Sequence, residues 1–303
     1  MYVQIGGIEQ WIQFNENEPE NPILLYLHGG PGGTSVPLAA IWKPWEEYFC
    51  VVHWDQRGAG RTFRKNGAAR CGRLTIDRMV EDGLEVAQFL VRTLNRPKVC
   101  LLGHSWGSVL GVLMVKRQPD LFSAFVGTGQ QVNMRRNEEH NYRWAYNRAA
   151  HLGDQEALEG LQLLGTPPYN DFGSLLALRE WTDRLTDGDG DPPRPSPGAL
   201  SPDFTAEDIS SMKRGTEFSR QQLLAELNAI DLPSLGTEFD MPMFFFQGTH
   251  DHYTSLDLAE EYFSVIAAPY KAFVRFEGCH HFAVMNKSGD FLRELLATVR
   301  PFL

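Results

Sequence analysis

Short runs of largely apolar residues recur along the chain, separated by segments in which apolar residues follow a helical period. Such runs are typical of strands that are buried on both faces. Strands of this kind that alternate with helices predict a mostly parallel sheet covered by helices. The runs are Ile23–Leu27, Cys50–Trp54, Val99–Leu102, Phe122–Val126, Met243–Phe246 and Phe273–Phe276, and the clearest helical periods are Met79–Leu94 and Leu256–Ile266.

The first residues follow a different pattern, because apolar and polar residues alternate there. Alternation over Tyr2–Ile5 and Glu9–Phe14, with Gly6 and Gly7 between them, predicts two half-buried strands joined by a turn. Strands that are polar on one face are typical of an antiparallel edge. We therefore expect these two strands at one edge of the sheet.

Strand-like runs disappear between about 130 and 235 and resume at Met241. This segment predicts a helical insertion that covers the carboxyl edge of the sheet as a cap. The chain then divides into a first part of the core (1–129), the cap (130–235) and a second part of the core (236–303). The amphipathic segments of the cap are Glu138–His151, Gln155–Leu164, Leu175–Leu185 and Gln221–Ile230.

A stretch rich in Pro and Gly, Asp187–Gly198, interrupts the cap. Its opening D-x-D-x-D is similar to the start of a calcium-binding loop. However, Pro192 stands where that loop needs its turn glycine, and Gly198 stands where it needs a bidentate glutamate. The stretch therefore predicts a mobile lid loop and no calcium site.

The sequence Gly-His-Ser-Trp-Gly at 103–107 connects the run Val99–Leu102 to a helical pattern that starts at Trp106. A G-x-S-x-G motif between a strand and a helix predicts a nucleophile elbow, a strained turn that lifts the serine hydroxyl above the sheet. The glycines at both ends avoid collisions where strand and helix cross. Ser105 is therefore the predicted nucleophile.

A serine nucleophile needs a histidine base that a carboxylate orients. In enzymes built around this elbow, the chain order is serine, then the acid, then the histidine. Asp251 directly follows the run Met243–Phe246, at the edge of the sheet where Ser105 is expected, and is the predicted acid. His250 and His252 flank it, but no third ligand at a fixed spacing accompanies them, so no metal is predicted.

Two neighbouring histidines, His280 and His281, follow the last strand-like run. The helical pattern Gly289–Val299 comes next, and its first strong apolar residue is Phe291. Counting back from this residue, the loop register favours His281 as the base. His280 remains the alternative, because loop register is the only argument.

The oxyanion that forms when a serine attacks a carbonyl needs backbone N–H donors. Trp106 follows the nucleophile and supplies one donor. The glycine-rich loop His28–Gly33 follows the run Ile23–Leu27, and we assign Gly30 in it as the second donor. No Gly-Lys-Ser/Thr follows these glycines, which excludes a phosphate-binding loop.

Composition narrows the class of protein. The net charge of −10 over 303 residues argues against nucleic-acid and anionic-membrane partners. No apolar run approaches the length of a membrane helix, and the first residues lack the pattern of a signal peptide. The four cysteines are scattered without metal-ligand spacing, and Cys50 and Cys100 fit buried apolar positions in strand-like runs, which together indicate a reducing compartment. We expect a cytoplasmic protein that needs no cofactor.

Three motifs together resemble the α/β-hydrolase superfamily, and within it the proline iminopeptidase-like serine peptidases. They are His28-Gly-Gly-Pro-Gly32, Asp55-Gln-Arg-Gly-Ala-Gly-Arg-Thr62 and Ser105-Trp-Gly-Ser108. The resemblance covers Ile23–Arg117 and Met241–Leu303 and is weaker in the cap. It implies an α/β-hydrolase fold and the removal of an N-terminal residue, typically proline, from small peptides or amides.

The chain departs from the pattern of these peptidases at His104, where they usually carry glycine, and at Thr62, where they usually carry serine. The family also implies acidic cap residues that bind the free amine of the substrate. Our candidates are Glu138 and Glu139, with a solvated helix face as the alternative explanation for both. We interpret Asp55 and Arg57 as structural residues beneath the oxyanion loop.

These observations predict a serine hydrolase that cleaves a small amide or peptide bond through an acyl-enzyme, and the resemblance implies an aminopeptidase of the proline iminopeptidase type. Two other functions remain. The first is an esterase, lactonase or amidase for a specialised metabolite, because the cap departs from the family. The second is a ligand-sensing protein with slow turnover. A measurement of steady-state turnover discriminates between a sensing protein and an enzyme. The sequence does not predict an oligomeric state.

Overall fold

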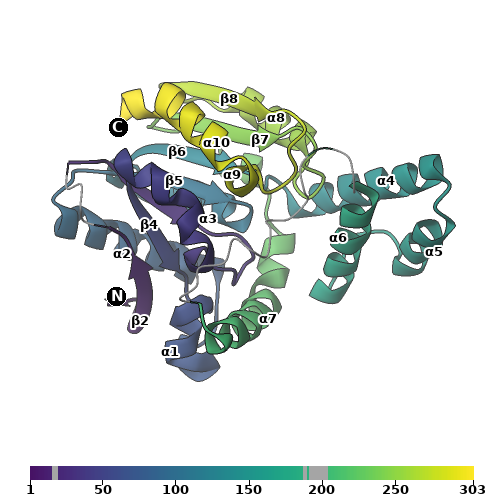
Figure 1. Ribbon diagram of the computed structural model, residues 1–303, viewed down its shortest axis with the longest axis horizontal. Coiled ribbons are helices and arrows are strands. Elements are labelled where there is room, and N and C mark those ends of the chain that lie inside the picture. Colours follow the sequence, from purple (N-terminus) through teal and green to yellow (C-terminus); the bar gives the residue numbers. More distant parts are fainter. Residues whose placement is uncertain (16–19, 187–189, 191–203) are drawn as a thin grey trace.

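The computed structural model describes residues 1–15, 20–186, 190 and 204–303. Eight strands form one sheet in the order β1-β2-β4-β3-β5-β6-β7-β8 (Figure 1). β2 pairs antiparallel with both of its neighbours, β1 and β4, and all other neighbouring strands pair parallel. The strands are β1 (Tyr2–Ile5), β2 (Ile8–Gln13), β3 (Ile23–Leu27), β4 (Cys50–Asp55), β5 (Val99–His104), β6 (Phe122–Thr128), β7 (Met243–Gly248) and β8 (Lys271–Phe276).

Helices cover both faces of the sheet, and alternate residues of each buried strand contact the two layers. In β3, Leu25 packs toward α2 (Ile76–Leu94), α3 (Trp106–Arg117) and α8 (Leu256–Val265). Its neighbour Tyr26 packs with η1 (Val36–Glu47), α9 (Ala283–Asn286), α10 (Ser288–Glu294) and η5 (Leu295–Val299). The predicted α/β-hydrolase fold is thereby confirmed. Two short 3-10 helices are η2 (Pro119–Leu121), which precedes β6, and η6 (Arg300–Phe302), near the C-terminus.

The described residues between β6 and β7 form four α-helices. Three of them, α4 (Met134–Leu152), α5 (Gln155–Leu164) and α6 (Phe172–Thr186), share an apolar cluster of their own and project from the sheet (Figure 1). The fourth helix, α7 (Ala206–Asn228), is followed by η4 (Leu232–Leu235) and packs on α1 (Gly60–Cys71). The predicted lid loop at 187–198 lies outside the described residues except for Gly190.

Two polar contacts fix the cap to the loop after β7. The side chain of Asn141 on α4 donates a hydrogen bond to the carbonyl oxygen of His252 at 2.6 Å, and Asn137 accepts one from the backbone of Ser255 at 2.8 Å. The ring of Trp144 stacks on the ring of His252 with 3.6 Å between centroids. These contacts hold α4 against the loop that carries Asp251.

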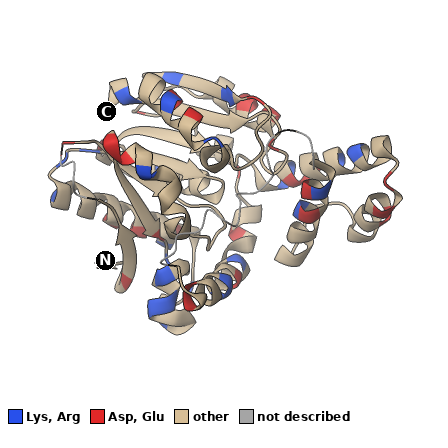
Figure 2. Ribbon diagram, in the orientation of Figure 1, with Lys and Arg blue, Asp and Glu red and all other residues tan. Residues whose placement is uncertain are grey.

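The sequence pattern missed α1, η1 and the first half of α7. α7 lies close to the residues just before α1, because a Cβ on Gly215 would lie 2.7 Å from the carbonyl oxygen of Gly58, and Phe218 of α7 packs on Phe63 of α1 with 5.4 Å between ring centroids. Polar contacts supply the rest. Ser219 donates to the same carbonyl at 2.9 Å, and Arg64 pairs with Asp208 at 2.9 Å. Residues of both charges mark these two helices in Figure 2.

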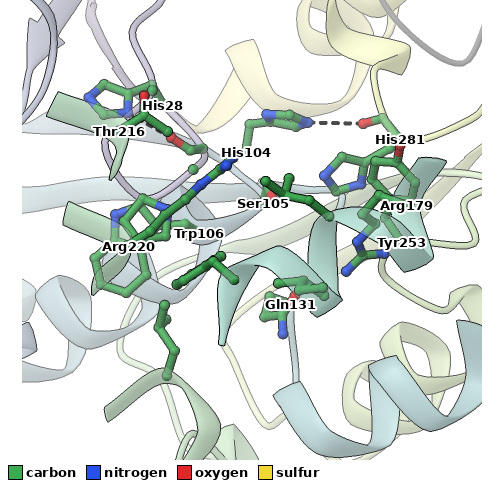
Figure 3. Close-up of a pocket in the computed structure, with 18 of the residues that line it drawn as sticks. His28, His104, Ser105, Trp106, Gln131, Arg179, Thr216, Arg220, Tyr253 and His281 are labelled. Carbon is green, nitrogen blue, oxygen red and sulfur yellow. Dashed lines mark hydrogen bonds between the residues drawn. The ribbon is translucent and has the colours of Figure 1, made fainter. Parts of the chain in front are cut away.

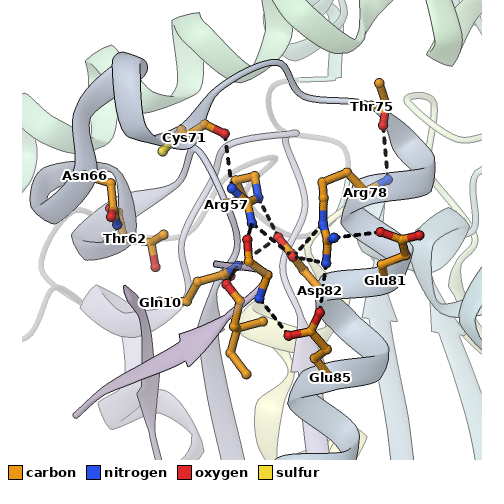
Figure 4. A network of polar contacts seen from close by, with 12 residues as sticks. Gln10, Arg57, Thr62, Asn66, Cys71, Thr75, Arg78, Glu81, Asp82 and Glu85 are labelled. Atoms are coloured by element: carbon orange, nitrogen blue, oxygen red, sulfur yellow. Dashed lines mark hydrogen bonds and ion pairs between the residues drawn. The ribbon is translucent and has the colours of Figure 1, made fainter. Parts of the chain in front are cut away.

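A buried ion pair joins the N-terminal hairpin to α2 (Figure 4). Arg57 donates to Asp82 at 2.7 Å and to the carbonyl oxygens of Gly6 and Cys71 at 2.7 and 3.1 Å. Gln10 also donates to Asp82, at 2.8 Å. The contacts of Arg57 are therefore structural, with the turn between β1 and β2, the end of α1 and α2.

Among the described residues, no helix is both long and apolar enough to cross a membrane.

Candidate active site

Ser105 lies at the turn between β5 and α3 with φ 57° and ψ −121°. This combination is sterically costly for a residue with a Cβ, and such strain is typical of functional positions. The carbonyl oxygen of Ser105 accepts hydrogen bonds from the backbone and the hydroxyl of Ser108 at 2.8 and 2.6 Å, and its N–H donates to Thr128 on β6 at 3.0 Å. The turn is therefore held on both sides, and the Ser105 side chain lines a cavity.

The glycines at the ends of the motif allow β3, β5 and α3 to approach closely. A Cβ on Gly103 would lie 2.4 Å from the carbonyl oxygen of Gly107, and a Cβ on Gly107 would lie 1.9 Å from the carbonyl oxygen of Leu27. Any other residue at either position would push the helix away from the strand. A nucleophile elbow requires this close approach of strand and helix, and the two glycines of the motif allow it.

Asp251 follows β7, is almost fully buried and accepts several hydrogen bonds. Its Oδ1 accepts from the backbone N–H groups of Tyr253 and Thr254 at 3.0 and 2.9 Å. Its Oδ2 accepts from the hydroxyl of Thr254 at 2.7 Å and from the side chain of Gln247 at 3.0 Å. These donors leave the carboxylate a single orientation, toward His281.

The ring of His281 lies within hydrogen-bonding distance of this carboxylate, with 2.9 Å between its Nδ1 and Oδ2 of Asp251. Burial alone would raise the pKa of Asp251. The positive charge and the hydrogen bond of His281, together with the hydrogen bonds from Thr254, outweigh burial and hold that pKa below its ordinary value. Asp251 is therefore ionised at neutral pH and holds a proton of His281 on Nδ1, which leaves Nε2 for the substrate side.

The neighbouring histidine turns away from this pair. The Nδ1–H of His280 donates to the carbonyl oxygen of His250 at 2.9 Å, and its ring lies beside those of His250 and His252. His281 lines the cavity with Ser105, whereas His280 does not. In the part of the chain that the structure describes, no group of three or more His, Cys, Asp or Glu side chains could hold a metal ion.

A second histidine positions the first. The Nε2–H of His104, one residue before the nucleophile, donates to the carbonyl oxygen of His281 at 2.9 Å (Figure 3). Burial, aided by the charge of His281, lowers the pKa of His104 to about 3, so this residue is neutral at physiological pH. Sequence analysis noted His104 only as a departure from the family. Its position directly before Ser105 was the available signal.

The predicted oxyanion donors, Gly30 and Trp106, line the same cavity as Ser105. The N–H of Trp106 is among the first amides of α3, which have no acceptor within the helix. The indole N–H of Trp106 donates to the side chain of Gln56 at 2.9 Å, and the Gln56 backbone N–H donates to Nε2 of His28 at 3.2 Å. Burial lowers the pKa of His28 to about 4, so it accepts this bond as a neutral ring at the base of the oxyanion loop.

The cavity above Ser105 has a volume of about 1240 Å³ and lies between the core and the cap. Its charged lining is mainly cationic, which the sequence analysis did not foresee. In Figure 3, Arg179 of α6 lies on the Tyr253 side of Ser105 and Arg220 of α7 lies on the opposite side, toward Trp106. Among the described residues that line the cavity, the cationic side chains are Arg179, Lys213 and Arg220, and the carboxylates are Asp171 and Glu217.

The two candidate amine ligands do not line this cavity. Glu139 is exposed on α4. Glu138 is 1% exposed, and neither of its carboxylate oxygens has a hydrogen-bonding partner among the described residues. Burial raises the pKa of Glu138 to about 7, although the positive charge of Arg179 acts in the opposite direction. Glu138 thus interacts electrostatically with Arg179, which lines the cavity, but does not line the cavity itself.

Replacing Glu138 with glutamine is expected to stabilise the protein at pH 8 more than at pH 5. The pKa of Glu138 is about 7 in the folded protein, against an ordinary value of 4.5. Because the unfolded chain releases this proton first as pH rises, stability is lost as pH rises from about 4.5 to 7, and the loss between pH 5 and pH 8 is about 2–3 kcal/mol. Glutamine removes this loss. Urea unfolding at both pH values measures it, and an equal effect at the two would contradict it; Glu139→Gln is the exposed control.

With this geometry established, the comparisons with known proteins can be interpreted. The family model for the alpha/beta hydrolase fold matches residues 22–288. The chain therefore belongs to the α/β-hydrolase family. It is similar over nearly its whole length to a probable aminopeptidase, YbaC, of Bacillus subtilis, with 29% identity over 99% of this chain and 96% of that protein.

Two further relatives are proline iminopeptidases. The protein from Heyndrickxia coagulans is 32% identical over 114 residues, which are 38% of this chain and 36% of that protein. The crystal structure of the Mycobacterium smegmatis enzyme superposes with a TM-score of 0.68 at 21% identity and covers 100% of this chain and 96% of that one. The structural similarity concerns the fold, and the resemblance to the proline iminopeptidases is confirmed.

Proposed function

We propose that this protein is a serine aminopeptidase that removes an N-terminal residue from short peptides through an acyl-enzyme. The observation that carries the proposal is the pairing of His281 with Asp251 at the rim of the cavity that Ser105 lines. The similarity along the whole chain to a probable aminopeptidase supports peptides as the substrate class. All four cysteines are buried as thiols rather than joined in disulfides, which agrees with a reducing compartment such as the cytoplasm.

In the proposed reaction the hydroxyl of Ser105 attacks the scissile carbonyl while Nε2 of His281 takes its proton. Asp251 keeps the imidazole oriented and stabilises its charged form. The backbone N–H groups of Gly30 and Trp106 stabilise the oxyanion. His281 then protonates the leaving amine, and a water molecule, activated by the same imidazole, attacks the acyl-enzyme ester and releases the product.

The proposal is tested with a panel of chromogenic substrates. We expect the protein to hydrolyse prolyl and alanyl anilides, and acetylation of the prolyl amine to lower kcat/KM by at least about tenfold, because a free amine that binds a carboxylate contributes a charge-assisted hydrogen bond. Short-chain p-nitrophenyl esters complete the panel. Ester turnover without anilide turnover would reject the aminopeptidase and favour an esterase.

Two variants of one helix locate the amine ligand. If Glu138 meets the substrate amine after the cap adjusts, Glu138→Gln raises KM for the prolyl anilide and leaves the acetylated anilide unchanged. Glu139→Gln makes the same change on the exposed face of the same helix. It is the matched control and should behave like the wild type. A Glu217→Gln variant tests the carboxylate that lines the cavity directly.

A further inference from the structure

Among the described charged side chains that line the cavity, cations outnumber carboxylates by three to two, and amine recognition does not explain this excess. Its described lining holds two arginines and a lysine, although the whole chain has a net charge of −10. One of its two carboxylates, Asp171, already accepts hydrogen bonds from the backbone and the hydroxyl of Ser174 at 2.8 Å each. A cavity of this character favours a substrate with an anionic group.

Arg179 is the cation best placed to bind that group. Its Nη1 is buried and has no hydrogen-bonding partner among the described residues. Its guanidinium lies over the ring of Tyr253, 4.3 Å from the ring centroid (Figure 3). A buried guanidinium N–H without a partner is costly unless a ligand supplies the acceptor.

The position of Arg179 relates it to the reacting groups. The ring of Tyr253 is 5.1 Å from the ring of His281, centroid to centroid. The guanidinium carbon therefore lies no more than about 9.4 Å from the centre of the imidazole. The hydrogen bond between the guanidinium and a carboxylate takes up about 3 Å of this distance, and one or two peptide residues at about 3.5 Å each span the rest. A scissile carbonyl at Ser105 and a carboxylate at Arg179 can thus belong to one short peptide.

We propose that Arg179 binds the C-terminal carboxylate of the substrate, so that the enzyme acts on peptides of two or three residues with a free C terminus. The proposal rests on the aminopeptidase function proposed above and names its substrate class. A guanidinium and a carboxylate form two parallel hydrogen bonds, and neither lysine nor a neutral side chain reproduces that geometry. In a longer peptide the terminal carboxylate lies too far from the scissile bond to meet Arg179, and an amidated peptide has no terminal carboxylate, so both should be poorer substrates.

The test compares prolyl-glycine with prolyl-glycinamide, which differ only in the terminal carboxylate, by chromatographic detection of released proline. The wild type is expected to hydrolyse the acid with a kcat/KM at least tenfold above that of the amide. Arg179→Gln should lower kcat/KM for the acid at least tenfold, mainly through KM, and change that for the amide less than threefold. Arg179→Lys should recover only part of the loss.

Arg214→Gln is the matched control, because Arg214 lies on α7, is exposed and does not line the cavity. Equal wild-type efficiency on the acid and the amide would overturn the proposal without any variant, so a poorly folded Arg179→Gln protein does not block the test. An equal loss on both peptides in a folded variant would also overturn it and leave the aminopeptidase intact. Hydrolysis of neither peptide, alongside ester turnover, would reject the aminopeptidase function itself.

Discussion

Ser105→Ala is expected to lower kcat on every substrate by at least about 10³-fold while the protein stays folded, because without the hydroxyl no acyl-enzyme can form. The oxyanion donors are backbone N–H groups and remain in place, which accounts for any residual rate. The backbone at residue 105 keeps its strained φ of 57° in the variant, since alanine also carries a Cβ. The free energy of unfolding should therefore change by less than about 1 kcal/mol.

Two further variants separate chemistry from folding. Ser105→Gly should be equally inactive but more stable by about 1 kcal/mol, because glycine adopts a positive φ without strain. His281→Gln should lose activity like Ser105→Ala, whereas His280→Gln should retain most of it, because His280 contacts His250 and does not line the cavity. Steady-state kinetics and urea unfolding on the same preparations measure both quantities. Full turnover by purified Ser105→Ala would refute the mechanism.

The sequence predicted the sheet well because its information is local. Runs such as Ile23–Leu27 are apolar on both faces and allow no other placement in a soluble α/β protein, and β3 has these same bounds. α5 likewise spans Gln155–Leu164 as predicted. The C-terminal pattern Gly289–Val299 was harder, because the structure divides that region into α10 and a π-helical segment, a change of pitch that periodicity does not register.

The candidate site was predictable only where chain order and strand ends determine it. Ser105, Asp251 and His281 all follow strands, so a parallel sheet brings them to one edge. Arg179 and Tyr253 meet through the packing of α6 against the loop after β7, a tertiary contact with no signature in either segment. The acidic amine ligand was sought by composition along α4. Only the fold shows that Glu138 is buried and that Glu139 faces outward.

The largest effect on stability is expected from Asp82→Leu, at about 3–5 kcal/mol, because it leaves the cation of Arg57 buried without its partner. The side chain of Arg57 is 5% exposed and that of Asp82 is fully buried. The same carboxylate also accepts from Gln10 and Arg78 at 2.8 Å each, so its loss leaves several donors unsatisfied. Measured against a typical total of about 5–15 kcal/mol, this loss is severe.

A double variant distinguishes the buried pair from a general loss of packing. Arg57→Met with Asp82→Leu removes both charges and keeps apolar volume, so it should be less destabilised than Asp82→Leu alone. Asp77→Ala, at the start of the same helix, is the control. Asp77 pairs with Arg117 at 2.6 Å, but both side chains are at least half exposed, so its loss should cost less than about 1 kcal/mol. If urea unfolding finds that Asp82→Leu lowers the free energy of unfolding no more than Asp77→Ala does, the pair does not hold the hairpin to α2. A buried guanidinium left without its carboxylate would destabilise the protein more than that.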